Sequence, residues 1–490
     1  MSIPWDVLVV GGGTAGLVSA KTAASFGARV LLVERKRTGG DCLWTGCVPS
    51  KALLAAASSA ADARAASRLG VVIDGVSVDF SRVMDHVRSA IAAIEPADSP
   101  RSLEAAGVRV ESGDLTFTGP RSAVIDGRPV DFHQAIICSG SSPAVPPIPG
   151  LAAASPLTSD SVWGLETIPG RFAILGGGSI GCELGQAFAR LGSEVTIVEG
   201  ADRILTREDP QAASLVAEAL TRDGVTFRTG SPVVEVKSAL TTGQLILENG
   251  VTVDFDRLLV SVGRRPRTSD LGLDRAGVAL DKLGYVRVDK QLRTTNASIW
   301  AAGDVSGHPQ FTHTAGVNGS LAASNAILGL RRRVDTTTIP RVTFTSPEVA
   351  AVGVSTETAA RRSELRVVNW DHEHLDRAVV ESDVHGFTKF VVDGKGRVLG
   401  ATVVGPRAGE TLGELILAVR HGLRTRDIAG TTHPYPTYND GVWNASIDDV
   451  RSQLRTPPAA RAIRVLSTTR RRWLGSSLRK GLDNRPGRGG

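Results

Sequence analysis

The feature that most constrains the fold is a strand–glycine loop–helix–strand pattern that occurs twice, at Val7 to Glu34 and at Ala173 to Glu199. One offset of 165 positions relates every matched residue. So many matches at a single offset predict two copies of one supersecondary unit in an α/β fold. The matched residues are Gly11, Gly13 and Gly16 with Gly176, Gly178 and Gly181, and then Gly27, Val30, Val33 and Glu34 with Gly192, Val195, Val198 and Glu199.

The glycine spacing in both copies, G-x-G-x-x-G, suits the binding of a dinucleotide. The first glycine permits a tight turn, the second lets a pyrophosphate approach the backbone, and the third lets the helix pack closely on the strand. The helix start then holds the phosphates, and an acid at the end of the next strand, Glu34 or Glu199, binds ribose hydroxyls. A glycine-rich turn in some other α/β protein would explain one copy, but not the recurrence of strand, helix, second strand and acid. We therefore expect two bound dinucleotides.

Length and composition set the wider frame. The 490 residues, 42% of them hydrophobic, exceed what one core ordinarily holds, so about three domains are expected. No run of about 18 apolar residues occurs, and Met1 leads into a strand-like segment without a charged leader. These observations favour a globular, cytoplasmic protein.

Cys42 and Cys47 lie in a short glycine-rich stretch directly after the first unit. Residues five apart on an ideal helix point about 140° away from each other, so a bridge needs an irregular turn. Gly46 and a helix that starts at Pro49 can supply that turn. So short a loop adds little stability, and a short, strained bridge is of the kind that exchanges.

Two alternative roles for this pair compete with redox chemistry. The cysteines could fill a core, or they could be half of a metal site, but a metal needs about four nitrogen or sulfur ligands. The sequence has four cysteines in all and no second C-x-x-C motif or histidine cluster. We favour redox exchange at Cys42 and Cys47, and we expect Cys138 and Cys182, which stand in apolar contexts, to be small buried residues.

The stretch Gly39-Gly-Asp-Cys-Leu-Trp-Thr-Gly-Cys-Val-Pro-Ser-Lys51 resembles the active site of the class I pyridine nucleotide-disulfide oxidoreductases. This family includes dihydrolipoamide dehydrogenase, glutathione reductase and mercuric reductase. The resemblance implies that the first unit binds FAD and the second NAD(P)H. It also implies that Cys42 meets the substrate, that Cys47 contacts the flavin, and that Lys51 and Glu183 pair beside the flavin ring.

Further motifs extend the resemblance over roughly residues 5 to 450. Ile136 to Pro143 resembles the crossover strand of the family, Val262 to Pro266 its G-R-x-P-N element, Ala302 to Asp304 its second FAD motif, and Phe344 to Gly353 the opening of its dimerisation domain. Gly40, Gly140, Gly263 and Asp304 are thereby assigned to cofactor binding. The implied α/β architecture is a homodimer with two Rossmann-like domains and a C-terminal α+β domain. Its limits are 1–147 with 264–335 for FAD, 148–263 for NAD(P), 336–450 for dimerisation and 451–490 for a basic tail.

One motif departs from the family. Disulfide reductases end in H-x-H-P-T-x-x-E, whereas this chain reads His433-Pro-Tyr-Pro-Thr-Tyr-Asn-Asp440. Tyr435 thus stands at the position of the catalytic histidine, and Asp440 at that of the glutamate that would orient it. A phenol titrates near 10 and an imidazole near 6.5, so Tyr435 is a poor base at neutral pH. Mercuric reductases also have tyrosine here, but they rely on a C-terminal cysteine pair, and no cysteine follows Cys182. An aromatic pair at a dimer interface is the alternative role for Tyr435 and Tyr438.

The second acid also bears on the choice of nicotinamide. A carboxylate at Glu199 binds a free 2′-hydroxyl and repels a 2′-phosphate, which favours NAD(H), and Gly181 in place of alanine agrees. Arg203 could instead turn toward a phosphate. We therefore expect NAD(H), with NADP(H) as the alternative.

The positive charge of the chain is concentrated at its end. The formal charge is +6, but residues 451–490 hold eleven of the 56 Lys and Arg residues and one of the 50 Asp and Glu residues, which leaves about −4 for the rest. Residues 459–482 can form a helix with Ile463, Leu466, Trp473, Leu474, Leu478 and Leu482 within about 180°, interrupted by Arg470. Such a helix suits the surface of an anionic membrane, and a solvated tail ending in a flexible 484–490 is the alternative. Nucleic acid is not an expected partner, because no recognition motif accompanies the charge.

The sequence therefore predicts an FAD-dependent NAD(P)H oxidoreductase with a redox-active Cys42–Cys47 disulfide. Its acceptor would be a disulfide, a metal ion or another thiol-reactive species. Two alternatives are direct transfer from flavin to a quinone and a membrane-docked flavin redox sensor with little turnover.

Overall fold

A computed structural model describes residues 3–239 and 242–483, with side chains up to 475. The chain divides into two compact units, with the boundary between Val349 and Ala350. The side chains of Leu478 and Leu482, and all of 484–490, lie outside the described residues.

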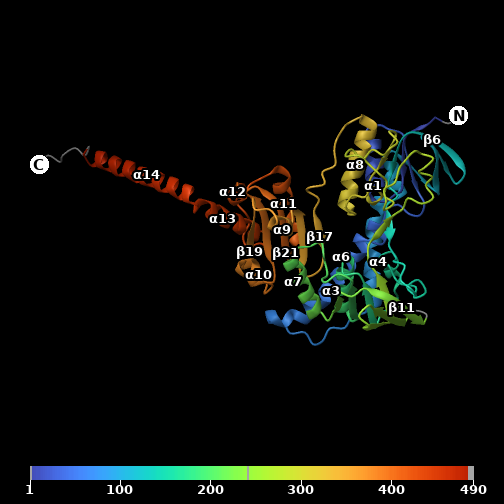
Figure 1. Ribbon diagram of the computed structural model, residues 1–490, viewed down its shortest axis with the longest axis horizontal. Coiled ribbons are helices and arrows are strands. Elements are labelled where there is room, and N and C mark those ends of the chain that lie inside the picture. The colour runs from blue at the N-terminus through green and yellow to red at the C-terminus, as the bar shows by residue number, and fades with distance from the viewer. Residues whose placement is uncertain (1–2, 240–241, 484–490) are drawn as a thin grey trace. The chain divides into compact units, whose positions relative to one another are not determined.

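A seven-stranded sheet forms the first part of unit 1 (Figure 1). Its order is β3-β2-β1-β6-β5-β4, with β16 also paired to β6. β1 is a continuous apolar strand, as expected for a strand covered on both faces: Val7 and Val9 belong to the core that includes α1 and α8, and Leu8 and Val10 to the core on the other side. The elements are β1 (Trp5–Val10), α1 (Thr14–Ser25), β2 (Val30–Glu34), α2 (Gly40–Trp44), α3 (Cys47–Ala65), α4 (Phe80–Asp98), α5 (Pro100–Ala105), β3 (Val108–Ser112), β4 (Leu115–Gly119), β5 (Ser122–Ile125), β6 (Arg128–Ile137), β16 (Ile299–Ala301) and α8 (Thr312–Leu328).

The second glycine unit lies in a separate parallel sheet of order β10-β9-β8-β14. Beside it in the sequence, β11, β12 and β13 form an antiparallel sheet, and β7 pairs with β15. The elements are β7 (Ser141–Pro143), β8 (Arg171–Leu175), α6 (Ser179–Leu191), β9 (Glu194–Glu199), α7 (Pro210–Arg222), β10 (Thr226–Thr229), β11 (Val233–Ala239), β12 (Thr242–Leu247), β13 (Thr252–Phe255), β14 (Arg257–Val260), β15 (Arg264–Pro266) and β17 (Arg341–Thr343).

Unit 2 is an α+β unit in which β18, β21, β20 and β19 follow one another in a sheet. The predicted α/β class with a C-terminal α+β part is confirmed, whereas the predicted domain limits stay predictions. The elements are β18 (Glu348–Gly353), α9 (Thr356–Ala360), β19 (Leu365–Asp371), α10 (Asp376–Val380), β20 (Phe387–Asp393), β21 (Val398–Gly405), α11 (Ala408–His421), α12 (Thr425–Ala429), α13 (Asp440–Leu454) and α14 (Pro457–Asp483).

Candidate active site

The first glycine loop joins β1 to α1 and has little room for side chains. Gly11 has φ +103°, and a Cβ there would lie 2.5 Å from the carbonyl oxygen of Cys138. A Cβ on Gly16 would lie 1.8 Å from the carbonyl oxygen of Gly11. The carboxylate of Glu34, at the end of β2, accepts a 2.6 Å hydrogen bond from the backbone of Gly12. Turn, helix start and acid are thus held together as the sequence pattern predicts.

The second loop repeats this geometry between β8 and α6. Gly176 has φ +110°, and a Cβ on Gly181 would lie 2.0 Å from the carbonyl oxygen of Gly176. Glu199 accepts a 2.7 Å hydrogen bond from Gly177, the counterpart of the bond to Glu34.

The two loops differ in what covers them. A Cβ on Gly13 would lie 3.8 Å from the Cα of Gly40, and one on Gly40 would lie 2.6 Å from the Cα of Gly13. The segment that carries the cysteines therefore lies against the first loop at backbone contact. A Cβ on Gly178, the counterpart of Gly13, would meet nothing within 4 Å among the described residues.

A cavity of about 1120 Å³ in unit 1 brings many of the predicted site residues together. Gly16 is not among its lining residues, because it packs beneath the loop. From the region of the second glycine unit, Glu183 lines the cavity. The predicted nicotinamide-site residues do not line it: Gly176, Gly178, Gly181, Glu199 and Gly263. Tyr435 and Asp440 belong to unit 2. The predicted residues in the lining are Gly11, Gly13, Glu34, Gly40, Cys42, Cys47, Lys51, Gly140, Glu183 and Asp304.

Cys42 lies in the short helix α2, and Cys47 is the first residue of α3. Both are free thiols. Helix α3 begins two residues before Pro49. In this first turn a backbone N–H would have no partner within the helix, so a proline, which lacks the N–H, is tolerated there. Gly46 precedes the helix, and a Cβ there would lie 2.8 Å from the carbonyl oxygen of Asp41. The pKa values of the two thiols depend on each other, so this tight turn brings the two side chains close together.

The two thiols differ in acidity. A hydrogen bond from the Cys42 thiol lowers the pKa of Cys47 to about 6, and the Thr312 hydroxyl and the Lys51 charge act in the same direction. The same hydrogen bond, together with burial, raises the pKa of Cys42. The Cys47 sulfur is 3.1 Å from the Thr312 hydroxyl, which must be the donor when Cys47 is a thiolate. Position at a helix start also favours the thiolate of Cys47.

Lys51 and Glu183 form an ion pair, with 2.9 Å between Nζ and Oε2. The second Glu183 oxygen accepts a 3.0 Å hydrogen bond from the backbone of Phe344, and the Lys51 ammonium lies 4.2 Å from the centre of the Phe344 ring. Glu183 is buried, so the pair is fixed on its acidic side. One positive side chain is thereby held next to Cys47 in the cavity.

An ionic network near Asp304 was not predicted from the sequence. Asp304 accepts a 2.6 Å hydrogen bond from Ser141, and Arg264 donates to Ser141 at 2.7 Å. Arg264 also pairs with Asp41, the residue next to Cys42. Arg264 belongs to the Val262 to Pro266 motif, so the sequence marked this region as part of the site. No sequence pattern, however, links Arg264 to Asp41, which lies more than 200 positions away. Thr312 gave no signal either, because a lone threonine at a helix start ordinarily has a local role.

Glu199 and Arg203 have well-defined backbone partners. Glu199 accepts hydrogen bonds from Gly177 and, at 2.9 Å, from Ala201. Arg203 donates to the carbonyl oxygens of Leu205 and Thr206 at 2.9 and 3.2 Å. The carboxylate therefore lies at the end of β9 beside the glycine loop, while the guanidinium binds the chain a few residues further on.

The Tyr435 hydroxyl donates a 2.5 Å hydrogen bond to Asp376, not to Asp440. Asp440 is buried at the start of α13, where it accepts a hydrogen bond from the backbone of Thr437. In the structure Asp440 therefore does not bind the Tyr435 hydroxyl, although the alignment had suggested that contact. Its carboxylate instead stabilises the start of helix α13. Tyr435 is 71% exposed, and its bond to Asp376 raises its pKa.

Comparison with known proteins decides the family. Residues 5–319 match the model of "Pyridine nucleotide-disulphide oxidoreductase", and residues 339–446 match that of its dimerisation domain. The chain belongs to this family. Members bind FAD and a nicotinamide cofactor, and the dimerisation domain supports a homodimer.

Individual relatives agree with this assignment. A dihydrolipoyl dehydrogenase of Chlamydia trachomatis is 34% identical over 473 residues, which cover 94% of this chain and 100% of that protein. A mercuric reductase of Streptomyces lividans is 36% identical over 455 residues, 89% of this chain and 94% of that protein. Among solved structures, the Cu(II) complex of the HOCl-induced flavoprotein disulfide reductase RclA from Escherichia coli has a TM-score of 0.82 and 28% identity, covering 91% of this chain and 99% of that one.

This family member is an FAD-dependent oxidoreductase, as the sequence predicted. The residues fit a dinucleotide, because the glycine positions leave the space that a pyrophosphate needs and a carboxylate stands at the end of the second strand of each unit. Within 3–239 and 242–483, no helix has both the length and the apolar character needed to cross a bilayer.

Proposed function

We propose that this enzyme transfers electrons from NADH to a thiol-reactive acceptor through a redox-active Cys42–Cys47 disulfide. The observation that carries the proposal is the position of Cys47. It starts helix α3, its pKa is lowered to about 6, and it lines the same cavity as the covered glycine loop and the Lys51–Glu183 pair. A thiolate held in this way suits redox exchange.

The two glycine units receive different nucleotides in this proposal. The cysteine segment covers the first loop at Gly13, which suits a resident cofactor, whereas the second loop is uncovered at Gly178 among the described residues, which suits a nucleotide that enters and leaves. FAD would be held by Gly11, Gly13, Gly16, Glu34, Gly40, Lys51, Gly140 and Asp304, and the nicotinamide nucleotide by Gly176, Gly178, Gly181, Glu199 and Gly263.

Each turnover is balanced in electrons and protons. Oxidation of one NADH to NAD⁺ releases two electrons and one proton. These break the Cys42–Cys47 bond and form the Cys42 thiol and the Cys47 thiolate. Oxidation of this pair back to the disulfide passes two electrons to the acceptor and releases the proton. FAD, when bound, supplies a two-electron carrier between the nicotinamide and the sulfur atoms.

Lys51 and Glu183 would act as a fixed charge in the cavity. The Lys51 ammonium stabilises negative charge that develops nearby on reduction, including that of the Cys47 thiolate. Glu183 holds the ammonium in place. The Cys42 thiol, whose pKa is raised, keeps its proton and donates a hydrogen bond to the Cys47 thiolate until an acceptor arrives.

The proposal specifies NAD(H) over NADP(H). Glu199 is held beside the loop by two backbone hydrogen bonds and repels a 2′-phosphate. Arg203, which could have offset this repulsion, binds the carbonyl oxygens of Leu205 and Thr206. A ratio of kcat/KM for NADH over NADPH below one would contradict this choice.

The weak acidity of the Tyr435 phenol argues against an ordinary disulfide as the electron acceptor. Reduction of an ordinary disulfide releases a thiolate that a general acid must protonate, and the hydrogen bond to Asp376 makes the phenol a weaker acid. A thiophilic metal ion needs no such proton. We therefore propose a metal ion or an activated disulfide as acceptor, and the Cu(II) bound in the Escherichia coli RclA structure adds copper to the ions worth testing.

The test measures NADH oxidation by the full-length enzyme with Cu(II), Hg(II), lipoamide, glutathione disulfide and quinones. Cys42→Ser should lower turnover with the thiol-reactive acceptors by about 100-fold or more, because the disulfide cannot form. Cys138→Ser is a control at a buried thiol that has no partner cysteine. Unchanged turnover of Cys42→Ser with every acceptor would remove the dithiol from the mechanism.

A further inference from the structure

Helix α14, at the end of the described chain, extends beyond the matched family domains. The dimerisation model ends at residue 446, and α14 covers Pro457–Asp483. The Escherichia coli structure matches over 99% of its own chain but only 91% of this one. The helix therefore lies outside the residues that match the two family models.

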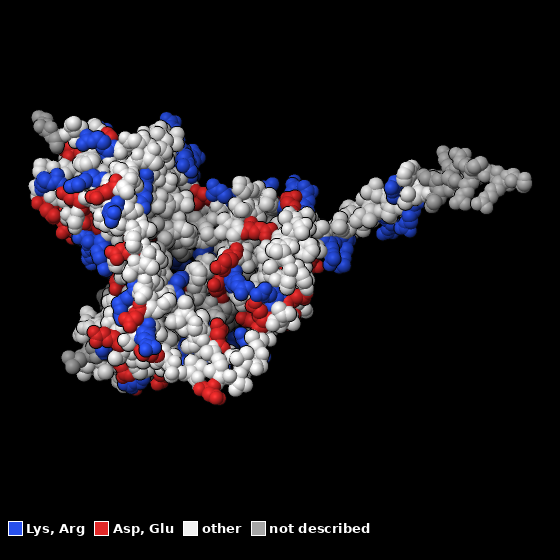
Figure 2. All heavy atoms as spheres, turned by 180° about the vertical axis from the view of Figure 1, so that it is seen from behind, with Lys and Arg blue, Asp and Glu red and all other residues white. Residues whose placement is uncertain are grey.

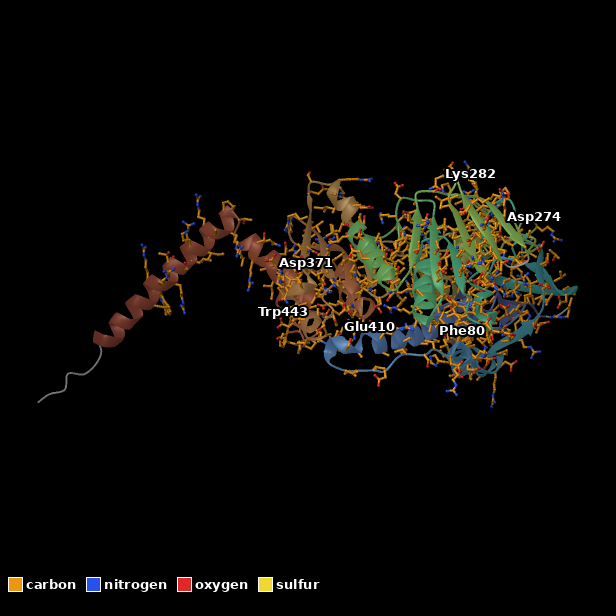
Figure 3. The ribbon with its side chains drawn as sticks, turned by 90° about the horizontal axis from the view of Figure 1, so that it is seen from below. Phe80, Asp274, Lys282, Asp371, Glu410 and Trp443 are labelled. Atoms are coloured by element: carbon orange, nitrogen blue, oxygen red, sulfur yellow. The ribbon has the colours of Figure 1, made fainter. Side chains whose placement is uncertain are left out.

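The described side chains of α14 project into open space on both sides of the helix (Figure 3). Its large apolar side chains are exposed: Ile463 by 45%, Leu466 by 70%, Trp473 by 54% and Leu474 by 43%. A helix of this kind has no core of its own to bury them in, so its apolar side chains require a partner.

The apolar and basic side chains occupy opposite faces. At 100° per residue, Ala462, Ile463, Leu466, Trp473 and Leu474 fall within about 120°. Arg461, Arg464, Arg471 and Arg472 fall within about 100° on the other side. Three of these arginines line a shallow hollow with Thr468 and Thr469. Blue spheres mark the arginines of the helix in Figure 2.

We propose that α14 binds the surface of an anionic lipid bilayer, with its apolar face in the headgroup region and its arginines on lipid phosphates. Residues 457–475 contain five arginines, four on the basic face and Arg470 in the apolar arc, and no acid, and the chain outside 451–490 has a formal charge of about −4. Attraction to an anionic surface therefore comes from this segment. Apolar insertion and basic charge are the two terms that hold an interfacial helix.

Arg470 favours a bilayer over a second copy of α14. It lies within the apolar arc, and its guanidinium is 4.3 Å from the centre of the Trp473 ring. In a paired helix this charge would be buried in the seam, whereas at a bilayer a long cationic side chain reaches the phosphates. A nucleic acid would use the arginines but leave Leu466, Trp473 and Leu474 in water.

The experiment is flotation of the full-length, FAD-loaded protein with vesicles of phosphatidylglycerol and phosphatidylcholine, against vesicles of phosphatidylcholine alone. Binding should require the anionic lipid and weaken as salt is raised. The double variant Leu466→Ser/Trp473→Ser should raise the lipid concentration for half-binding by about ten-fold. Val465→Ser is the matched control, because Val465 is 60% exposed on the basic side of the same helix, and it should change that concentration by less than about two-fold.

Several outcomes would overturn the proposal. These are no flotation, equal flotation with both vesicles, or equal losses in the apolar and control variants. Tighter retention by duplex DNA than by anionic vesicles would assign the helix to nucleic acid. Loss of the dimer on deletion of 457–490, measured by sedimentation without lipid, would assign it to a second copy. NADH oxidation with a water-soluble acceptor should be unchanged in every variant, which separates this test from that of the catalytic proposal.

Discussion

The two glycine units of this enzyme have nearly the same backbone and different surroundings. Glu34 and Glu199 accept equivalent hydrogen bonds of 2.6 and 2.7 Å, and α1 and α6 both begin after a glycine with extended backbone. In each unit a later segment donates a 2.9 Å backbone hydrogen bond to the loop, from Gly39 to Gly12 and from Leu205 to Gly177. The difference lies at the second glycine of the motif, where Gly40 contacts Gly13 but no described residue lies within 4 Å of a Cβ placed on Gly178. This difference underlies our proposal that the first unit keeps its nucleotide bound and the second exchanges it. After Glu34 comes a cysteine segment that folds back on the loop, and after Glu199 comes a segment without cysteine.

The largest expected effect comes from placing alanine at the first glycine of each unit. Gly11→Ala and Gly176→Ala both force a left-handed backbone on an alanine, which costs about 1–2 kcal/mol. Both also push a Cβ against a carbonyl oxygen, at 2.5 and 2.8 Å. Gly11→Ala should purify with about a tenth of the wild-type flavin or less, measured from its absorbance. Gly176→Ala should keep its flavin and lose about 100-fold in kcat/KM for NADH. Flavin loss in Gly176→Ala alone would reverse the assignment.

A smaller effect is expected at the two acids. Glu199→Gln removes the charge that repels a 2′-phosphate, so the ratio of kcat/KM for NADPH over NADH should rise about ten-fold. The measurement is steady-state oxidation of each nucleotide with one fixed acceptor. Glu34→Gln makes the same chemical change in the other unit and should leave that ratio unaltered. A rise in both variants would mean that the acids act only through stability.

The segment that covers the first loop allows a pH test at Cys47. The pKa of this thiol is about 6, so its thiolate is present above that pH and is lost as the pH falls through it. Because the folded pKa is lowered, the ionised thiol stabilises the fold fully above its usual value of 9 and no longer does so below about 6. Thr312→Val removes a hydrogen bond worth about 1 kcal/mol and should raise the midpoint by about half to one unit.

The midpoint of Cys47 ionisation can be measured from the pH dependence of the rate at which iodoacetamide alkylates Cys47 in the NADH-reduced enzyme. Thr314→Val is the matched control, since its buried hydroxyl on the same helix has no partner within the described part of the chain. Equal midpoints in Thr312→Val and wild type would exclude the hydroxyl as a support of the thiolate.

The smallest effect is expected at Arg203. Its guanidinium donates to two backbone carbonyl oxygens in the second glycine unit, so we expect it to stabilise the loop rather than to bind a ligand phosphate. Arg203→Ala should change the NADH to NADPH preference by less than about two-fold while lowering the melting temperature slightly. A large gain in NADH preference would show that the arginine does contact the nucleotide.

Features that depend on neighbouring residues could be predicted from the sequence. The 165-residue offset predicted two units whose hydrogen bonds match atom for atom, because glycine conformation and strand–helix packing are set by residues within about 30 positions. The burial of Cys138 and Cys182 was expected from their apolar contexts and is confirmed.

Among contacts between distant segments, the Lys51–Glu183 pair was predicted through the family resemblance, but contacts that no motif covers could not be predicted. Asp41 meets Arg264, and Tyr435 meets Asp376, because folding brings together polar groups that no sequence period relates. The catalytic role given to Asp440 by alignment stays a prediction. In the structure its carboxylate accepts a hydrogen bond from the backbone N–H of Thr437, as an acid at a helix start commonly does.

The close approach of Gly40 to Gly13 has a consequence for how long this enzyme retains its flavin. If the flavin binds this loop as proposed, the segment that carries the sulfur atoms must move away before the flavin can leave, and that movement would separate Cys42 and Cys47 from their neighbours. Residence time and reactivity are therefore coupled. Conditions that remove the flavin should also lower the reactivity of the two thiols, and a fully reactive dithiol should indicate that the flavin is still bound.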